Sequence, residues 1–328
     1  GIGGWTELAR TTLGSAGDTI TVGSLADKRY YMFLIEGKPS STFVESQVRL
    51  NGDTGSNYSQ RTSFEGGAES TPTSTDKLSI HGEGSPNYPF FGVNYIANLS
   101  TKEKLLISNT VGQKTAGAGN APSRRETVGK HAQTSNPVTS ISSYGGSGGW
   151  NYSIGDEIVV LGWDDSDTHT SNFWEELDSV GRTTTSTMNS NTFTAKKYLW
   201  VQVYDHGQLS SGVTMRFNSD SGANYARRYS NNGGADSTST SNTTMYPYGS
   251  TATAPKFFNF FIINNSANEK LVMATSMGQE GSGAPTAPSR HESAIKWANT
   301  SSQITSIQVS ATGAHFGTSA IMKVWGSN

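Results

Sequence analysis

Hydrophobic residues along the chain occur in short runs, and several of these runs alternate with polar residues at every second position. Residues 47–50 (QVRL) and 213–217 (VTMRF) follow this period of two. Because successive side chains of a strand point to opposite faces, such alternation predicts a β-strand with one buried face and one wet face. Apolar and aromatic runs at 30–35 and 198–204 predict more deeply buried strands. Further candidate strands are 18–22, 77–81, 91–97, 104–111, 138–143 and 157–163.

An internal repeat divides the chain into two halves. Residues 49–61, RLNGDTGSNYSQR, return at 216–228 as RFNSDSGANYARR, with seven of thirteen positions identical. Residues 111–126, VGQKTAGAGNAPSRRE, return at 277–292 as MGQEGSGAPTAPSRHE, with nine of sixteen identical. Internal similarity of this kind indicates a repeated folding unit. We therefore predict an all-β protein with two tandem antiparallel β-sandwich domains, jelly-roll-like and derived from an internal duplication.

The repeat also predicts the domain boundaries. The first sandwich is expected at 1–163, an acidic linker at 164–171, and the second sandwich at 172–328. Trp5 returns as Trp174, and we match Trp163 with Trp325. Tryptophans near both ends of the first copy predict that its first and last strands pair. Calcium takes six to eight oxygen ligands, and the three aspartates of the linker are too few to supply them. A solvated acidic linker is therefore favoured over a calcium site.

Composition and charge narrow the classes of partner. The chain of 328 residues has 15% charged residues, 37 glycines and a formal net charge of −2. This balance gives no electrostatic case for a nucleic-acid partner. No apolar run approaches the roughly 18 residues of a membrane span, so we expect no membrane partner either. The chain has no cysteine, which excludes disulfides and thiolate chemistry.

The repeat supplies a test for catalytic residues, because an active site present in both copies must recur at matched positions. No histidine has a histidine partner in the other copy: His131 corresponds to Trp297, and His291 corresponds to Arg125. A histidine-dependent triad in both domains is therefore excluded. Matched carboxylates exist, but several stand beside Lys or Arg, as ion pairs do, and lack a sign of the apolar pocket that a general acid needs. We expect no enzyme activity and no cofactor.

Two matched turns resemble calcium loops at first sight. Residues 51–55 (NGDTG) and 218–222 (NSDSG) each contain a single carboxylate, whereas a calcium loop contains several. Asn, Asp and Gly at such positions are typical of a hairpin turn, in which the Asp caps its own backbone and Gly takes a positive φ. We therefore predict turns and no metal.

The glycine-rich stretch at 111–126 is not a nucleotide cradle. It lacks the spacing of a P-loop, and Gly119 becomes Pro285 in the second copy, which a backbone cradle for phosphate would not tolerate. We interpret it as a shaped connector that ends in an Arg-x-Glu motif at a contact surface. The interface residues that follow from this interpretation are Arg124, Glu126, Arg290 and Glu292.

Several phrases carry a resemblance to a known group of proteins. They are WTELARTTLGSAGDTITV, RLNGDTGSNYSQR, AGAGNAPSRRE and IVVLGW in the first copy, and FWEEL, RFNSDSGANYARR and APSRHE in the second. With these phrases the chain resembles uncharacterised structural (virion) proteins of environmental tailed bacteriophages. The resemblance implies a capsid decoration or cement protein, or part of a tail or fibre, on the virion surface. It implies other virion proteins as partners, namely major capsid or tail proteins, and a homo-oligomer, with a trimer as one arrangement.

A carbohydrate-binding, lectin-like tail-fibre or adhesion module is the alternative function, because β-sandwiches often present aromatic platforms to sugars. Four aromatic residues lie in Gly- or Ser-rich contexts suited to sugar stacking, although they do not match between the copies. These candidates are Trp150, Tyr152, Tyr246 and Tyr248.

Overall fold

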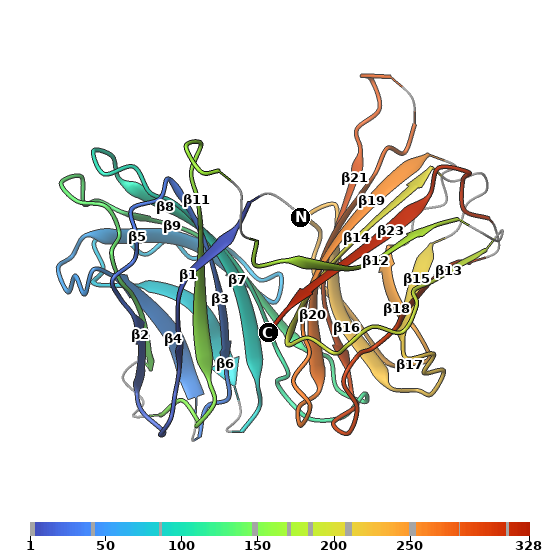
Figure 1. Ribbon diagram of the computed structural model, residues 1–328, viewed down its shortest axis with the longest axis horizontal. Helices are drawn as coiled ribbons and strands as arrows, with labels where there is room; N and C mark the ends of the chain where they lie inside the picture. The colour runs from blue at the N-terminus through green and yellow to red at the C-terminus, as the bar shows by residue number, and fades with distance from the viewer. Residues whose placement is uncertain are drawn as a thin grey trace. The chain divides into compact units, whose positions relative to one another are not determined.

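A computed structural model describes residues 4–40, 43–84, 87–145, 150–168, 172–182, 186–206, 212–248, 254–281, 283–312 and 315–328. Within these ranges the protein is all-β, with 23 antiparallel strands in four sheets and no helix. The chain forms two compact units (Figure 1). Unit 1 contains residues 1–115 and 123–173, and unit 2 contains residues 116–122 and 174–328.

Unit 1 has a sheet of seven strands and a sheet of four. The larger sheet has the order β1-β11-β3-β7-β8-β9-β5, and the smaller has the order β2-β10-β4-β6. The strands are β1 (Thr6–Thr12), β2 (Thr19–Val22), β3 (Tyr30–Gly37), β4 (Phe43–Leu50), β5 (Tyr58–Phe64), β6 (Leu78–Gly84), β7 (Phe90–Ala97), β8 (Lys104–Gly112), β9 (Ser123–His131), β10 (Ile141–Gly145) and β11 (Glu157–Trp163).

Unit 2 has a sheet of eight strands and a sheet of four. The larger has the order β12-β23-β14-β19-β20-β21-β16-β17, and the smaller has the order β13-β22-β15-β18. The strands are β12 (Glu175–Gly181), β13 (Thr187–Asn189), β14 (Tyr198–His206), β15 (Val213–Phe217), β16 (Tyr225–Asn231), β17 (Ser237–Asn242), β18 (Met245–Tyr248), β19 (Pro255–Ile263), β20 (Lys270–Gly278), β21 (Ser289–Trp297), β22 (Ile307–Ala311) and β23 (Ile321–Ser327).

Both units have the strand connectivity of a jelly roll. In unit 1 the order β1-β11-β3-β7 faces the order β2-β10-β4-β6, and β8, β9 and β5 extend the larger sheet. The chain alternates between the two sheets, as in two Greek keys wound into a sandwich. Unit 2 repeats this arrangement, with β17 as an additional edge strand. The all-β sandwich prediction is therefore confirmed, while a duplication as its origin stays a prediction.

The first and last strands of each unit pair, as the sequence predicted. β1 pairs with β11 and β12 pairs with β23, and each pair has a register shift at the same place, after Glu7 and after Glu176. The matching of the two final tryptophans was wrong by two residues. Trp163 lies opposite Tyr30 of β3, and Tyr30 corresponds to Tyr198 of β14. Trp325 lies opposite Trp200, which is two residues beyond Tyr198.

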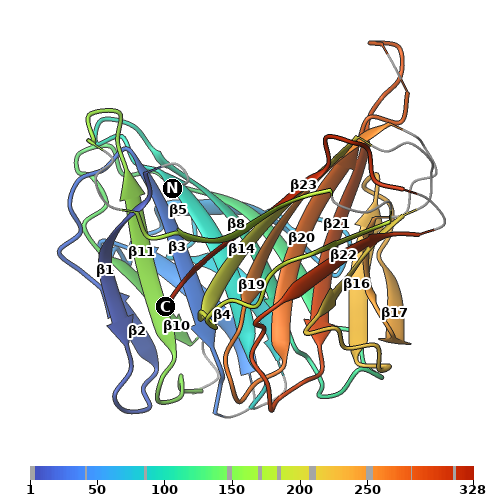
Figure 2. The same cartoon turned by 45° about the vertical axis from the view of Figure 1, so that its right-hand side comes forward.

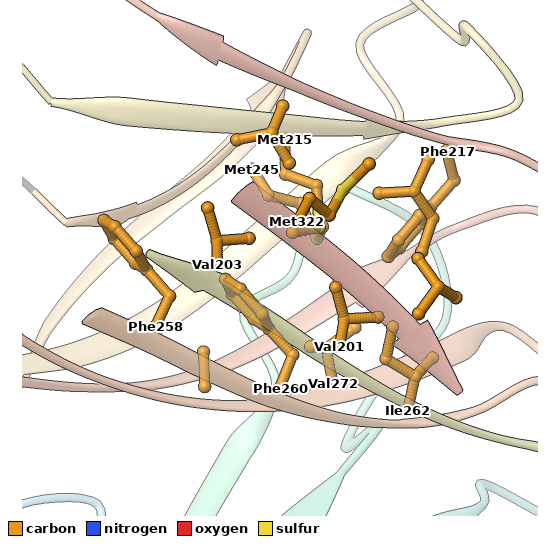
Figure 3. Packing of buried hydrophobic residues seen from close by; sticks show 14 of the residues in the cluster. Val201, Val203, Met215, Phe217, Met245, Phe258, Phe260, Ile262, Val272 and Met322 are labelled. Carbon is orange, nitrogen blue, oxygen red and sulfur yellow. The ribbon is translucent and has the colours of Figure 1, made fainter. Parts of the chain in front are cut away.

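Each sandwich holds one apolar core between its two sheets. In unit 2 the side chains of Val201 and Phe260 from the larger sheet meet those of Met215 and Met245 from the smaller sheet (Figure 3). Unit 1 has the equivalent core around Phe33, with members from both sheets. In the alternating segments of the sequence, the apolar side chains therefore point into these cores and the polar side chains between them point to the outer faces.

The stretch expected as an acidic linker belongs to unit 1 over its described residues. The boundary between the units falls between Phe173 and Trp174. Asp167 forms an ion pair with Lys28, and Asp164 accepts a hydrogen bond from the backbone N–H of Arg29 at 3.2 Å. The aspartates are therefore partnered by the first unit's own basic residues. Residues 169–171 lie outside the described residues.

Candidate functional site

A row of exposed apolar side chains crosses the outer face of the larger sheet of unit 2. Ile321 of β23 lies directly opposite Tyr204 of β14, Tyr204 lies opposite Phe257 of β19, and Phe257 lies opposite Met277 of β20. These four residues are 36%, 39%, 40% and 46% exposed. We call them the outer apolar row; Figure 2 shows their four strands side by side. Directly opposed residues on one face of a sheet have Cβ atoms about 5 Å apart, so the four side chains form one continuous patch.

Alternation along each strand explains why these residues point outward. Val203, Phe258 and Met322 are buried in the core, so their neighbours Tyr204, Phe257 and Ile321 must face the other way. Phase analysis of the strands in the sequence would place the row on the face opposite the core, which also carries Trp200, Phe261 and Trp325. The sequence interpretation did not single out the row, because which strands are neighbours is decided only by the fold.

The row ends at Arg290, one of the predicted interface residues. Arg290 of β21 lies opposite Met277, and its Nε is 3.3 Å from Oε1 of Glu292. The Arg290 side chain is 59% exposed, and that of Glu292 is 21% exposed. The structure thus places this Arg-x-Glu pair at the border of an apolar patch, where charged groups commonly surround a contact surface.

The matching pair in unit 1 has a different environment. Arg124 forms an ion pair with Glu126 on β9 and lies opposite Val111, but the Arg124 side chain is only 9% exposed. Phe91 and Glu36, which continue the corresponding row across β7 and β3, are also buried. The two Arg-x-Glu motifs are equivalent in sequence, but the arginine is exposed to solvent only in unit 2.

The structure corrects two of the sugar-stacking candidates. Trp150 and Tyr152 are fully buried in the core of unit 1, where their rings meet edge to face at 4.7 Å. The Tyr152 hydroxyl hydrogen-bonds with Ser143 at 2.7 Å and with Ser46 at 3.0 Å. These side chains fill the sandwich and present no face to a ligand, because a Gly- or Ser-rich context does not keep a large ring from packing inward.

The other two sugar-stacking candidates lie on β18 of unit 2. Tyr246 is half-buried, its ring lies 5.1 Å from the guanidinium of Arg227, and its hydroxyl accepts a hydrogen bond from the N–H of Gly212 at 3.1 Å. The side chain of Tyr248 lies outside the described part of the structure. Tyr246 is thus a packing residue within unit 2.

The two stretches that resembled calcium loops are tight turns, as predicted, but they are not hairpin turns, because each connects a strand of the smaller sheet to a strand of the larger sheet (β4 to β5 and β15 to β16). Asn51 and Gly52 have φ values of 56° and 63°, and Oδ1 of Asp53 accepts the N–H of Gly55 at 2.8 Å. In unit 2, Oδ1 of Asp220 accepts the corresponding N–H at 2.8 Å. The carboxylate satisfies backbone donors that a tight turn leaves free. Within the described ranges, no group of three or more His, Asp or Glu side chains is placed to hold a metal ion.

A pocket of about 320 Å³ opens in unit 1 between the edge strand β5 of the larger sheet and the edge strand β6 of the smaller sheet. Arg125 of β9 and Glu45 of β4 reach toward each other across it, with Nη1 of Arg125 donating to Oε1 of Glu45 at 2.9 Å. The sequence interpretation missed both residues. The pocket is lined by Glu45, Gln60, Thr62, Phe64, Ala68, Ser70, Pro72, Thr75, Lys77, Ser79 and Arg125.

The glycine-rich stretch is shared between the two units. Residues 116–122 belong to unit 2, while residues on both sides belong to unit 1. Within unit 2, Nε of Arg228 donates to the carbonyl of Pro122 at 2.9 Å, and the N–H of Gly117 donates to Oε1 of Glu269 at 2.6 Å. The stretch holds its shape through hydrogen bonds to specific partners, in keeping with a shaped connector.

Comparison with known proteins identifies no relative. Neither a protein-family model nor a curated protein sequence matches the chain. In the part of the chain that the structure describes, no helix is long and apolar enough to span a membrane. The features of the molecule that bear on its function are the outer apolar row with Arg290 and Glu292 at its border, and the pocket of unit 1.

Proposed function

We propose that the chain is a non-enzymatic structural protein of a phage particle, a decoration or cement subunit that binds the outside of the virion. In this proposal the outer apolar row of unit 2 contacts another virion protein, either a major capsid or a tail protein. The observation that carries the proposal is the row itself: four large apolar residues stand exposed and adjacent on four neighbouring strands. Contiguous exposed apolar patches with polar borders mark protein–protein contact sites.

The chemistry of the row suits a protein partner. Aromatic residues, Met and Arg are enriched in the cores of protein interfaces, and the row combines Tyr204, Phe257 and Met277 with Arg290 at its border. The four strands of the row are each paired on both sides, so the row is rigid before binding. Little conformational entropy is lost when such a surface is covered.

The test is a particle-binding experiment. Particles assembled without the protein are mixed with the wild type or with Tyr204→Ser/Phe257→Ser, and bound protein is measured by co-sedimentation. We expect binding to weaken at least roughly tenfold, because central aromatic residues dominate interface energies. The control is Leu105→Ser/Ile107→Ser, which removes two apolar residues that are even more exposed, from the larger sheet of unit 1.

The control should bind as the wild type does. Unchanged binding of the Tyr204→Ser/Phe257→Ser protein, or an equal loss in both variants, would show that the row is not the contact. No binding of the wild type to capsids or tails would remove the virion proposal itself.

A further inference from the structure

We propose that the pocket between β5 and β6 of unit 1 binds a neutral, hydroxyl-rich ligand of the size of a small saccharide. This site is separate from the outer apolar row and does not depend on the virion function. Its volume of about 320 Å³ lies at the lower end of the range of small-molecule sites. Four observations define the ligand class: the charge balance, the free hydrogen-bonding groups, the apolar wall and the contrast with unit 2.

The pocket contains buried charges that compensate each other. Arg125 is only 8% exposed, and its guanidinium donates to Glu45 and, through Nε, to the Thr62 hydroxyl at 2.9 Å. Burial acts to raise the pKa of Glu45, but hydrogen bonds and the charge of Arg125 outweigh it and hold that pKa below its usual value. Glu45 is therefore ionised and neutralises Arg125. Lys77 at the wall is 3.3 Å from Asp76, which also pairs with Arg49. The buried Arg125–Glu45 pair thus leaves no net charge of its own in the pocket.

The same groups keep hydrogen-bonding capacity for a ligand. A guanidinium has five N–H donors, and Arg125 uses two of them within the described part of the chain. The Gln60 oxygen accepts the N–H of Ser79 at 2.6 Å, while its amide nitrogen makes no hydrogen bond to the described residues. Each oxygen of Glu45 accepts one hydrogen bond and can accept another. Donors and acceptors side by side match hydroxyl groups, which both donate and accept.

Gly82 of β6 allows the guanidinium to take this position. A Cβ atom at Gly82 would lie 2.5 Å from Nη1 of Arg125, so only glycine leaves room for it. Phe64, Ala68 and Pro72 add apolar atoms to the lining of the pocket. A ring with polar edges and an apolar C–H face, as sugars have, would be complementary to this mixed lining.

Unit 2 fills the corresponding place with its own side chains. Tyr58 and Tyr225 occupy matching positions opposite His131 and Trp297, so Gln60 and Thr62 correspond to Arg227 and Tyr229. The guanidinium of Arg227 lies 4.0 Å from the ring centre of Tyr229. Tyr229 in turn stacks at 5.2 Å on His291, which corresponds to Arg125. In unit 2 the side chains of Arg227, Tyr229 and His291 form a cation–π stack. In unit 1 the corresponding Gln60, Thr62 and Arg125 line the pocket.

The test uses saturation-transfer NMR and calorimetry with glucose, galactose, mannose and N-acetylglucosamine, and with acetate and inorganic phosphate as charged comparisons. The blocking variant is Ala68→Trp, on an exposed loop residue that lines the pocket. Its control is Thr73→Trp, on an exposed residue of the same loop that does not line it. Glu45→Gln keeps the volume and removes the charge-assisted acceptor.

We expect at least one neutral saccharide to bind the wild type and Thr73→Trp, and not Ala68→Trp. Glu45→Gln should weaken that affinity roughly tenfold, because hydrogen bonds to a charged group are about twice as strong as neutral ones. Thermal unfolding of each variant shows whether it is folded. Absence of saccharide binding, tighter binding of acetate or phosphate, or unchanged binding by folded Ala68→Trp would each overturn the proposal.

Discussion

Nε2 of His131 lies 2.7 Å from Oδ2 of Asp53, and this hydrogen bond ties the turn between β4 and β5 to the end of β9. In unit 2 the same place is taken by Trp297, whose Nε1 donates to Oδ2 of Asp220 at 2.6 Å. Two chemically different rings thus make one equivalent contact. The turn aspartate is the constant element, because it also accepts the N–H groups of its own turn.

Stability should fall in acid because of these two aspartates. Burial acts to raise the pKa of Asp53, but hydrogen bonds from His131, Asn57 and Gly55 outweigh it and lower the pKa below 3.8. The pKa of Asp220 is lowered in the same way, with Trp297 in place of His131. A lowered pKa stabilises the folded state above pH 3.8 and loses this effect as pH falls through the folded value.

We therefore expect the unfolding free energy, measured by urea denaturation, to drop as pH falls from about 5 through the lowered pKa values of the two aspartates. The variant Asp53→Asn/Asp220→Asn should show a smaller drop. Asp165→Asn, at an acid whose side chain is 67% exposed, is the control and should keep the wild-type pH dependence. An identical drop in all three proteins would contradict the assignment.

Gly162 should not accept an alanine. Its Cβ would lie 2.5 Å from Cδ1 of Leu8, the residue at the register shift of β1, and 2.8 Å from Lys28. Gly162→Ala is expected to destabilise unit 1 by about 1–3 kcal/mol through overpacking. Gly14→Ala, with no atom within 4 Å of the new Cβ, should stay within about 0.5 kcal/mol of the wild type. Equal melting temperatures for the two variants would be inconsistent with this packing.

Charge reversal of the arginine should lower the unfolding free energy much more in the Arg-x-Glu motif of unit 1 than in that of unit 2. The Arg124 side chain is 9% exposed and paired with Glu126, so Arg124→Glu would replace a buried, paired cation by a buried carboxylate next to the carboxylate of Glu126. We expect a loss of roughly 3–5 kcal/mol in unfolding free energy. The Arg290 side chain is 59% exposed, and Arg290→Glu should cost less than about 1 kcal/mol. Similar denaturation midpoints for Arg124→Glu and Arg290→Glu would contradict the difference in burial between the two arginines.

Removing Trp150 should affect folding rather than ligand affinity. The indole is fully buried, and its ring closely approaches Gly145. Trp150→Ala is expected to lower the unfolding free energy by roughly 3–5 kcal/mol, as large core truncations do. Leu105→Ala, at a residue 56% exposed, should be nearly neutral in the same denaturation experiment. A stable Trp150→Ala protein would show that the core tolerates the cavity.

Much of the fold could be predicted because its signals are local. The period of two at 47–50 and 213–217 marked strands that the structure contains, since alternation follows directly from strand geometry. Asp53 and its neighbours predicted a turn for an equally local reason, the capping of backbone donors within a few residues. That this turn connects two sheets and is not a hairpin depends on strand pairing, which is not local. The pairing of first and last strands was predicted from the tryptophans near both ends of the first copy, and the structure contains it in both units.

Matching by sequence failed where the surroundings differ. Arg124 and Arg290 carry the same motif, yet one is buried and the other exposed. Trp150 has glycine neighbours typical of a surface loop, yet it lies in the core. Burial is a property of everything packed around a residue, and those neighbours are distant in sequence.

By itself, the sequence determined the strand class, the repeated organisation and the turns, because each depends on residues a few positions apart. Only the tertiary structure decided which strands are neighbours. That choice aligned Tyr204, Phe257, Met277 and Ile321 into one exposed row. It also brought Arg125 and Glu45, which are 80 positions apart in the chain, together across a pocket. Strand order is set by the burial of whole sheet faces, and no short segment of the chain encodes it.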